Sequence, residues 1–293
     1  MKAVFLLASL VAAACAQPVG GVHERSFAPQ LQSVEAATGS RLGVALVDQD
    51  GRLIAGRRTE ERFAFCSTFK LLLGGMILDS ASDGKWSLDE RLYLTNSDLV
   101  FHSPVTEQHV DQGFITVRDA ARAIVTISDN AAANLLLRRV GGVQAFNHWL
   151  VRRGDQVTRL DRLEPSLNEN VPGDVRDTTT PKQIATNASH LLFGDWLPED
   201  EQKLLREWLI ASKTGLGRIR AGLPPNMISG DKTGTCGGRG RESYNDIAFI
   251  LPSADSGRGY VLAVYLDRPS AGAEGANAAI AQVANSAVPI MRR

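Results

Sequence analysis

Strand-like patterns in this 293-residue chain occur near both ends and are separated by a long helical segment, and this order restricts the folds that the chain can adopt. Runs of apolar and β-branched residues indicate five strands, at 41–47, 53–56, 228–234, 245–251 and 260–266. A turn sequence at 48–51 joins the first two. We therefore expect one antiparallel sheet of five strands, built from both ends of the chain, with a helical domain inserted between its second and third strands.

Apolar residues at helical spacing fill the middle of the chain and recur near its two ends. The predicted helices cover residues 27–37, 70–79, 117–127, 131–140, 143–153, 180–192, 199–211 and 272–288. The predicted fold class is α+β with two domains: residues 17–60 and 212–293 form a sheet domain flanked by helices, and residues 61–211 form an all-α domain. We expect the active site in the cleft between these two domains.

The first 16 residues are typical of a secretory signal peptide. Lys2 precedes an apolar run of 12 residues, Ala3–Ala14, which is too short to span a bilayer. Small residues at Ala14 and Ala16 then permit cleavage before Gln17. We expect export to the periplasm, with lipidation of Cys15 as an alternative. No later segment is apolar enough to cross a membrane, and we expect a monomer.

The charge balance and the histidines exclude several classes of function. Lys plus Arg and Asp plus Glu both number 32, so the composition does not indicate a nucleic-acid partner. The five histidines are scattered, and no two have the spacing of metal ligands. We therefore predict no catalytic metal and no cofactor.

A Ser-x-x-Lys pattern occurs at Ser67, Ser82 and Ser229, and the context of each distinguishes them. Ser82 is predicted in a loop and Ser229 on a strand, where residues three apart face opposite sides. Ser67 begins a predicted helix, so the Lys70 amine can reach its hydroxyl. The helix N-terminus also supplies N–H groups where an oxyanion would form. The alternative is a helix-capping serine with a surface lysine.

Lys-Thr-Gly occurs twice, at 213–215 and at 232–234. The first follows a predicted helix, and we interpret Gly215 as its C-cap. The second lies on a predicted strand, where Lys232 can bind an anionic group and Gly234 allows close approach of a backbone or ligand. Hydroxyls there come from Thr233 and Thr235. The alternative is a solvated edge strand.

Two further segments carry candidate catalytic groups. Ser128-Asp129-Asn130 lies between two predicted helices, where Ser128 can relay a proton and Asn130 can bind an amide or a lysine. The alternative for this segment is a purely structural one, the end of one helix followed by the cap of the next. The loop from Arg162 to Asp177 contains Glu164 and Asn168, which can hold one water between a carboxylate base and an amide. The alternative for that loop is a surface turn at Glu-Pro.

These four elements, in this order, resemble the class A serine β-lactamases along essentially the whole mature chain. The first three are shared with penicillin-binding proteins, whereas Glu-x-x-Leu-Asn at 164–168 separates the two families. The resemblance implies hydrolysis of the β-lactam ring of penicillins and cephalosporins, with antibiotic resistance as the consequence. Ser67 would be the nucleophile, activated by Lys70 and Glu164, and Ser128 would protonate the leaving nitrogen.

The resemblance also implies how the substrate is bound. Asn130 would bind the substrate amide and Lys70, and Glu164 with Asn168 would hold the deacylating water. The substrate carboxylate would bind to Lys232, Thr233, Gly234 and Thr235, and the oxyanion to backbone N–H groups of Ser67 and Thr235. An Arg162–Asp177 ion pair would fix the loop, and the peptide bond between Glu164 and Pro165 would be cis.

Cysteines beside the first and last motifs refine the subtype. Without Cys15, Cys66 and Cys236 remain, and an even count in an exported chain favours one disulfide over two free thiols. The resemblance places them opposite each other, as in the carbapenem-hydrolysing branch, so we expect carbapenems among the substrates. That branch also suggests that His102 forms a wall of the cleft and that Arg218 supplies a carboxylate-binding charge.

Two other functions share part of this pattern. A penicillin-binding D,D-peptidase would use the same three motifs on cell-wall peptides, and a β-lactam sensor would stay acylated. Both lack an efficient deacylating base, so residues 164–168 favour the hydrolase.

Overall fold

The computed structural model describes residues 22–238 and 242–292, and its main feature is a five-stranded antiparallel sheet. The strand order is β2-β1-β9-β8-β7. These strands are β1 (Arg41–Asp48), β2 (Leu53–Arg57), β7 (Ile228–Cys236), β8 (Ser243–Leu251) and β9 (Tyr260–Asp267). The first and last parts of the chain therefore share one sheet, which confirms the predicted architecture. The predicted signal peptide at 1–16, including Cys15, lies outside the described residues.

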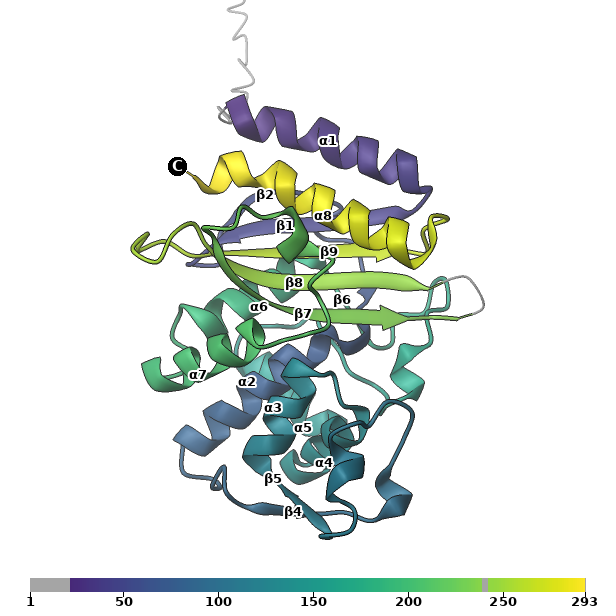
Figure 1. Cartoon of the computed structure of the whole chain (residues 1–293), viewed down its shortest axis with the longest axis vertical. Coiled ribbons are helices and arrows are strands. Elements are labelled where there is room, and N and C mark those ends of the chain that lie inside the picture. Colours follow the sequence, from purple (N-terminus) through teal and green to yellow (C-terminus); the bar gives the residue numbers. More distant parts are fainter. Residues whose placement is uncertain (1–21, 239–241, 293) are drawn as a thin grey trace, which may run out of the picture.

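Helices cover both faces of the sheet (Figure 1). On one face α1 (Val22–Thr38) and α8 (Gly272–Met291) pack together, and on the other lie α6 (Pro181–Leu192) and α7 (Glu199–Ile210). Alternate residues of β1 enter the two cores: Leu42 and Val44 pack with α1 and α8, whereas Ala45 packs with the helical core on the opposite face. The central strands are consequently buried on both sides.

The rest of the chain is a helical bundle below the sheet in Figure 1. Its helices are α2 (Phe69–Ser82), α3 (Val117–Thr126), α4 (Asn130–Val140) and α5 (Gly142–Arg152). Helix α2 is buried from Phe69 to Ser80 and forms the centre of this part. Because apolar side chains surround it, its position is fixed by packing on all sides.

Short elements that the sequence does not predict complete the fold. Two strand pairs form within the helical part: β3 (Phe63–Ala64) with β6 (Thr178–Thr179), and β4 (Arg91–Tyr93) with β5 (Phe114–Thr116). The 3₁₀ turns are η1 (Cys66–Thr68), η2 (Asn96–Asp98), η3 (Thr106–His109), η4 (Ser166–Asn168) and η5 (Ile219–Gly222). The domain boundaries at 60/61 and 211/212 stay a prediction.

Three local predictions differ from the structure. Helix α7 ends at Ile210 with Ala211 as its C-cap, so Gly215 is not a helix cap. A Cβ atom on Gly215 would collide with the carboxylate of Asp231, and this close approach explains the glycine. Ser82 is the last residue of α2 and does not lie in a loop, and Ser67 lies in the 3₁₀ turn η1, just before α2. Among the described helices, none is long and apolar enough to span a membrane.

Candidate active site

The side chain of Lys70 lies at the centre of the candidate site. It is fully buried in the first turn of α2, and its Nζ donates hydrogen bonds to Ser67 Oγ at 3.1 Å and to the Ser128 carbonyl at 2.9 Å. It also donates to Asn130 Oδ1. Burial lowers the pKa of Lys70, while the negative charges of Glu164 and Asp129 oppose this shift. The amine is thus held against Ser67 Oγ, which the sequence proposes as the nucleophile.

The carboxylate of Glu164 reaches the same point from the loop at 162–177. Its Oε1 lies 2.8 Å from Lys70 Nζ and 3.5 Å from Ser67 Oγ. Its Oε2 accepts a hydrogen bond from Asn168 Nδ2 at 2.5 Å. The Oδ1 atom of Asn168 is buried and has no hydrogen-bond partner among the described residues, so it can accept a hydrogen bond from a small polar molecule. Carboxylate and amide therefore converge beside Ser67 Oγ.

Loop contacts hold Glu164 in this position. Its backbone N–H donates to Asn134 Oδ1 at 3.0 Å, and Asn134 Nδ2 donates to its carbonyl at 2.9 Å. The peptide bond between Glu164 and Pro165 is cis. Arg162 Nε donates to Asp177 Oδ2 at 2.5 Å, and the other oxygen of that carboxylate accepts from the Arg162 backbone N–H at 3.0 Å. The two ends of the loop are thereby tied together.

Ser128 joins the two lysines of the site. Its Oγ accepts a hydrogen bond from Lys232 Nζ at 3.1 Å and lies 3.4 Å from Lys70 Nζ. Ser128 has a φ of 67°, between α3 and α4, and Asp129 caps α4 through a hydrogen bond from the Ala132 backbone N–H. Burial, with the nearby charge of Lys70, lowers the pKa of Lys232 to about 7. The hydroxyl of Ser128 is therefore a bridge along which a proton can move.

Strand β7 forms the opposite wall. A Cβ atom on Gly234 would lie 2.8 Å from the Phe65 carbonyl and 3.1 Å from Cys66 Cβ, so glycine is required there. This is the close backbone approach that the sequence predicts for Gly234. Thr235, the next residue, is exposed toward solvent. Thr233 Oγ1 donates to Thr214 Oγ1 at 2.8 Å.

Arg218 supports β7 from within the protein. It is only 8% exposed, and its guanidinium donates to the Gly234 carbonyl at 3.0 Å, the Asn245 carbonyl at 2.6 Å and Thr235 Oγ1 at 2.8 Å. Burial lowers the pKa of Arg218. The guanidinium thus places a positive charge directly beside the Thr235 hydroxyl.

A disulfide joins Cys66 to Cys236, as the sequence predicts, with 5.4 Å between the two Cα atoms. It connects η1, which carries Ser67, to the end of β7. Asn245 Nδ2 adds a second link, because it donates to the Ala64 carbonyl at 2.9 Å. The two walls of the site are therefore covalently joined.

These side chains surround a cleft of about 440 Å³. Its lining combines predicted residues with others that the sequence reasoning missed: Ser67, Phe101, His102, Ser128, Asn130, Pro165, Asn168, Thr214, Arg218, Thr233, Thr235, Cys236 and Gly237. Phe101, which is 83% exposed, stands at the rim beside His102. Thr214 belongs to the Lys-Thr-Gly sequence at 213–215 that we had assigned to a helix end. Phe101 could have been identified as an exposed aromatic side chain next to His102, and Thr214 by its place in a second Lys-Thr-Gly motif.

A nucleophilic serine, a buried lysine, a carboxylate and a cationic wall around one cleft are the groups that acyl transfer requires. Residues 26–290 match the β-lactamase enzyme family. The chain belongs to this family. It is 39% identical over 263 residues to β-lactamase FAR-1 of Nocardia farcinica, covering 90% of this chain and 82% of that protein. It is 42% identical over 251 residues to a β-lactamase of Amycolatopsis lactamdurans, covering 85% of this chain and 80% of that protein.

The solved structures identify the class. The class A β-lactamase of the last common ancestor of Gram-negative bacteria shares 46% identity and a TM-score of 0.85, over 90% of this chain and 99% of that one. A β-lactamase from Xanthomonas campestris shares 37% identity and a TM-score of 0.85, over 91% of this chain and 98% of that one. The protein is therefore a class A serine β-lactamase, which hydrolyses the β-lactam ring. Within residues 22–238 and 242–292, no cluster of three His, Cys, Asp or Glu side chains could hold a metal ion.

Proposed function

We propose that this β-lactamase forms an acyl-enzyme on Ser67 and that a water held by Glu164 and Asn168 hydrolyses it. The observation that carries the proposal is the position of Glu164: one carboxylate oxygen lies 3.5 Å from Ser67 Oγ, and the other is bonded to Asn168 Nδ2. A water beside this pair can give its proton to the carboxylate while its oxygen attacks the acyl carbon.

Acylation uses the lysines and Ser128. Ser67 Oγ attacks the lactam carbonyl, its proton passes to Glu164 or Lys70, and the carbonyl–nitrogen bond breaks. The ring nitrogen takes a proton from the hydroxyl of Ser128, to which Lys232 Nζ donates a hydrogen bond at 3.1 Å. Lys70 Nζ, 3.4 Å from Ser128 Oγ, passes the proton released by Ser67 on to Ser128 and so restores its hydroxyl. Deacylation then adds water, breaks the ester to Ser67 and returns the serine proton. No redox step or external reactant besides water is needed.

The cationic wall provides the carboxylate site. Lys232, Thr233 and Thr235 offer an ammonium and two hydroxyls along β7, and Arg218 adds a positive charge next to Thr235 Oγ1. Asn130 holds Lys70 through its Oδ1, and its Nδ2 donates to the Phe101 carbonyl at 2.7 Å. A substrate amide would therefore bind near Asn130 while the substrate carboxylate binds to β7.

We extend the proposal to carbapenems as well as penicillins and cephalosporins. The disulfide supports this extension because it fixes the spacing between Ser67 and the carboxylate site. His102 supports it as well, since its ring lines the cleft with Nε2 donating to the Ile127 carbonyl at 3.0 Å. A fixed cleft limits the misplacement of a small bicyclic substrate during turnover.

Steady-state kinetics with benzylpenicillin, a chromogenic cephalosporin and imipenem test these assignments. We expect continuous turnover of all three. A stoichiometric burst without turnover would instead identify a sensor or a slow D,D-peptidase, and turnover of the first two alone would remove carbapenems from the substrates.

We also propose that the protein is exported to the periplasm after removal of residues 1–16, and that it acts as a monomer. N-terminal sequencing of the secreted protein should begin at Gln17, whereas a lipid on Cys15 would establish the anchored form. Light scattering of the purified protein measures its oligomeric state.

A further inference from the structure

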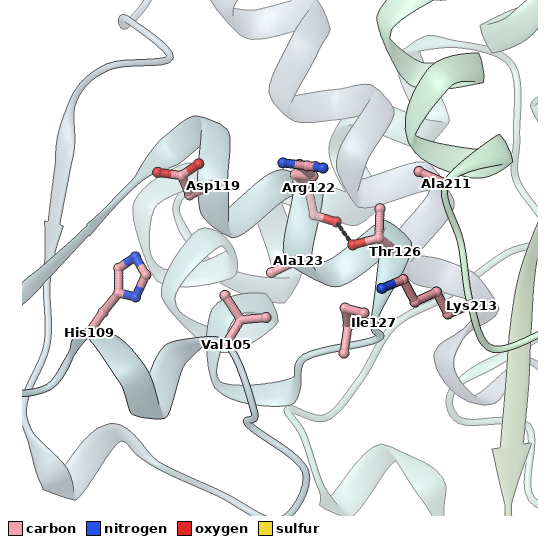
Figure 2. Close-up of a pocket in the computed structure, with 9 residues that line it drawn as sticks. All are labelled: Val105, His109, Asp119, Arg122, Ala123, Thr126, Ile127, Ala211 and Lys213. Carbon is pink, nitrogen blue, oxygen red and sulfur yellow. Dashed lines mark hydrogen bonds between the residues drawn. The ribbon is translucent and has the colours of Figure 1, made fainter.

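A second cavity, of about 420 Å³, opens between α3, η3 and the segment that follows α7 (Figure 2). It is similar in volume to the catalytic cleft of about 440 Å³. The described residues that line the two cavities do not overlap. None of the residues with a proposed role in catalysis or substrate binding lines this second cavity.

The cavity has an apolar floor and a cationic rim. Val105, Ala123 and Ile127 contribute apolar side chains to the lining, and Arg122 on α3 and Lys213 after α7 contribute two cations (Figure 2). Both cations are exposed, and within residues 22–238 and 242–292 neither forms an ion pair. Uncommitted positive charges above an apolar surface favour a ligand that has an anionic group on an apolar body.

The other polar groups of the cavity agree with this charge. His109 lines the cavity, and its Nδ1 is buried without a hydrogen-bond partner among the described residues. Asp119 is the one carboxylate in the lining, and its Oδ2 already accepts a hydrogen bond from Thr116 Oγ1 at 2.7 Å. Two cations against one engaged carboxylate leave the lining positive.

The floor of this cavity is also the rear of the Ser128 loop. Ile127 lines the cavity, its carbonyl accepts from His102 Nε2 at 3.0 Å, and the next residue is Ser128. The backbone N–H of Lys213 donates to the Thr126 carbonyl at 3.2 Å. The backbone N–H of Val105 donates to Asp129 Oδ2 at 2.9 Å. A ligand on this floor therefore touches segments that continue directly into the catalytic cleft.

We propose that this cavity is a second binding site for a small organic monoanion with an aryl or alkyl body, and that its occupation changes turnover in the catalytic cleft. Binding is independent of the proposed catalytic roles, whereas the effect on turnover rests on the role proposed for Ser128.

Titration of the full-length mature protein with 4-phenylbutanoate tests the binding. We expect saturable shifts of backbone NMR signals at 105–109, 122–127 and 211–213, and much weaker binding of the neutral 4-phenylbutan-1-ol. The double variant Arg122→Gln/Lys213→Gln should weaken binding about fivefold or more. The control Arg118→Gln/Lys203→Gln removes the same formal charge from positions of α3 and α7 outside the cavity, although Arg118 also loses its exposed ion pair with Asp89, and it should bind normally.

A steric variant keeps the test independent of charge. Ala211 is exposed at the rim, so Ala211→Trp can block the opening without changing the core. It should also abolish binding. Wild-type affinity in both the charge-deficient and the blocked variant, or signal shifts confined to the catalytic cleft, would overturn the site.

Kinetics test the coupling and the source of the anion. Saturating 4-phenylbutanoate should change kcat for a chromogenic cephalosporin about fivefold, and the effect should disappear in Arg122→Gln/Lys213→Gln. A rise in KM that persists in that variant would indicate competition in the cleft and overturn the coupling, as would unchanged kcat. Benzylpenicilloate, the product of hydrolysis, has two carboxylates and tests the source of the anion. The same response makes product the effector and overturns the restriction to monoanions, whereas no response assigns the site to a monoanionic organic acid.

Discussion

Lys70 Nζ lies 2.8 Å from Glu164 Oε1, and neither side chain is exposed to solvent. Both groups also reach Ser67 Oγ, at 3.1 Å and 3.5 Å. A buried pair of this kind depends on both members, because removal of one leaves an uncompensated charge in the interior. The pair therefore holds an amine and a carboxylate against Ser67 Oγ, where the proposed mechanism transfers the serine proton.

The pKa of Lys232, lowered to about 7 by burial and by Lys70, predicts a pH dependence. The Lys232 ammonium, which we propose binds the substrate carboxylate, is lost above about pH 7, so kcat/KM for benzylpenicillin should fall as pH rises through that value. In Lys232→Arg the guanidinium stays charged, so the fall should move to higher pH. An unchanged alkaline limb in Lys232→Arg would assign it to another group.

The same shift affects stability in the opposite sense. The unfolded lysine has a pKa of about 10.4, so between about 7 and 10 the unfolded chain binds more protons at this site than the folded chain does. The contribution of Lys232 to the free energy of unfolding therefore rises with pH across that window. Urea unfolding of wild type and Lys232→Met at several pH values isolates this contribution.

Arg218→Ala should weaken substrate binding and stability together. It removes the donor to Thr235 Oγ1 at 2.8 Å and leaves the Gly234 and Asn245 carbonyls without that partner. We expect KM for benzylpenicillin to rise about tenfold with a smaller change in kcat, and the free energy of unfolding to fall by about 1–3 kcal/mol. Arg218→Lys should reverse part of the rise in KM but not the loss of stability, because one ammonium group cannot make all the hydrogen bonds of the planar guanidinium. Unchanged KM in Arg218→Ala would exclude a role in substrate binding.

Removal of the disulfide should separate the substrates. In Cys66→Ala/Cys236→Ala we expect the free energy of unfolding to fall by about 2–5 kcal/mol. We expect kcat/KM for imipenem to fall about tenfold or more, because the walls of the cleft lose their fixed spacing. Benzylpenicillin should be affected much less. Equal losses for both substrates would show that the bond serves stability and not the spacing that carbapenems need.

Gly215→Ala tests the close approach to Asp231. The added methyl group overlaps the Asp231 carboxylate, so we expect destabilisation of about 1–3 kcal/mol. Gly217→Ala is a matched control, because its Cβ would meet Asn277 no closer than 3.9 Å. If the two variants melt at the same temperature, Gly215 is not required by packing.

The sequence predicted the elements that have a repeating pattern. The five strands alternate or are apolar throughout, and the helices repeat every three to four residues, so local spacing identified them within a few residues. The β3–β6 and β4–β5 pairs contain two or three residues per strand, which is too few for a pattern to emerge.

Contacts between distant segments explain what the sequence did not reveal about the site. Ser67, Lys70 and Glu164 were predicted from motifs and a family resemblance, and the structure brings these three side chains together. Thr214 was missed because it reaches the cleft through a hydrogen bond from Thr233 on β7, 19 residues further along the chain. Gly215 was misassigned because the Asp231 carboxylate that excludes a side chain comes from β7, 16 residues further along the chain.

The most direct test of the account is a time course of intact mass for Glu164→Gln mixed with benzylpenicillin. Glutamine keeps the size of the side chain but cannot take a proton from water, so kcat should fall by about a hundredfold to ten-thousandfold. Thermal melting checks that the variant folds, since the buried contact with Lys70 changes. We predict a persistent adduct of one benzylpenicillin per chain that peptide mapping places on Ser67, whereas wild type returns to the free mass. Turnover of Glu164→Gln at the wild-type rate without an adduct would contradict the deacylation mechanism.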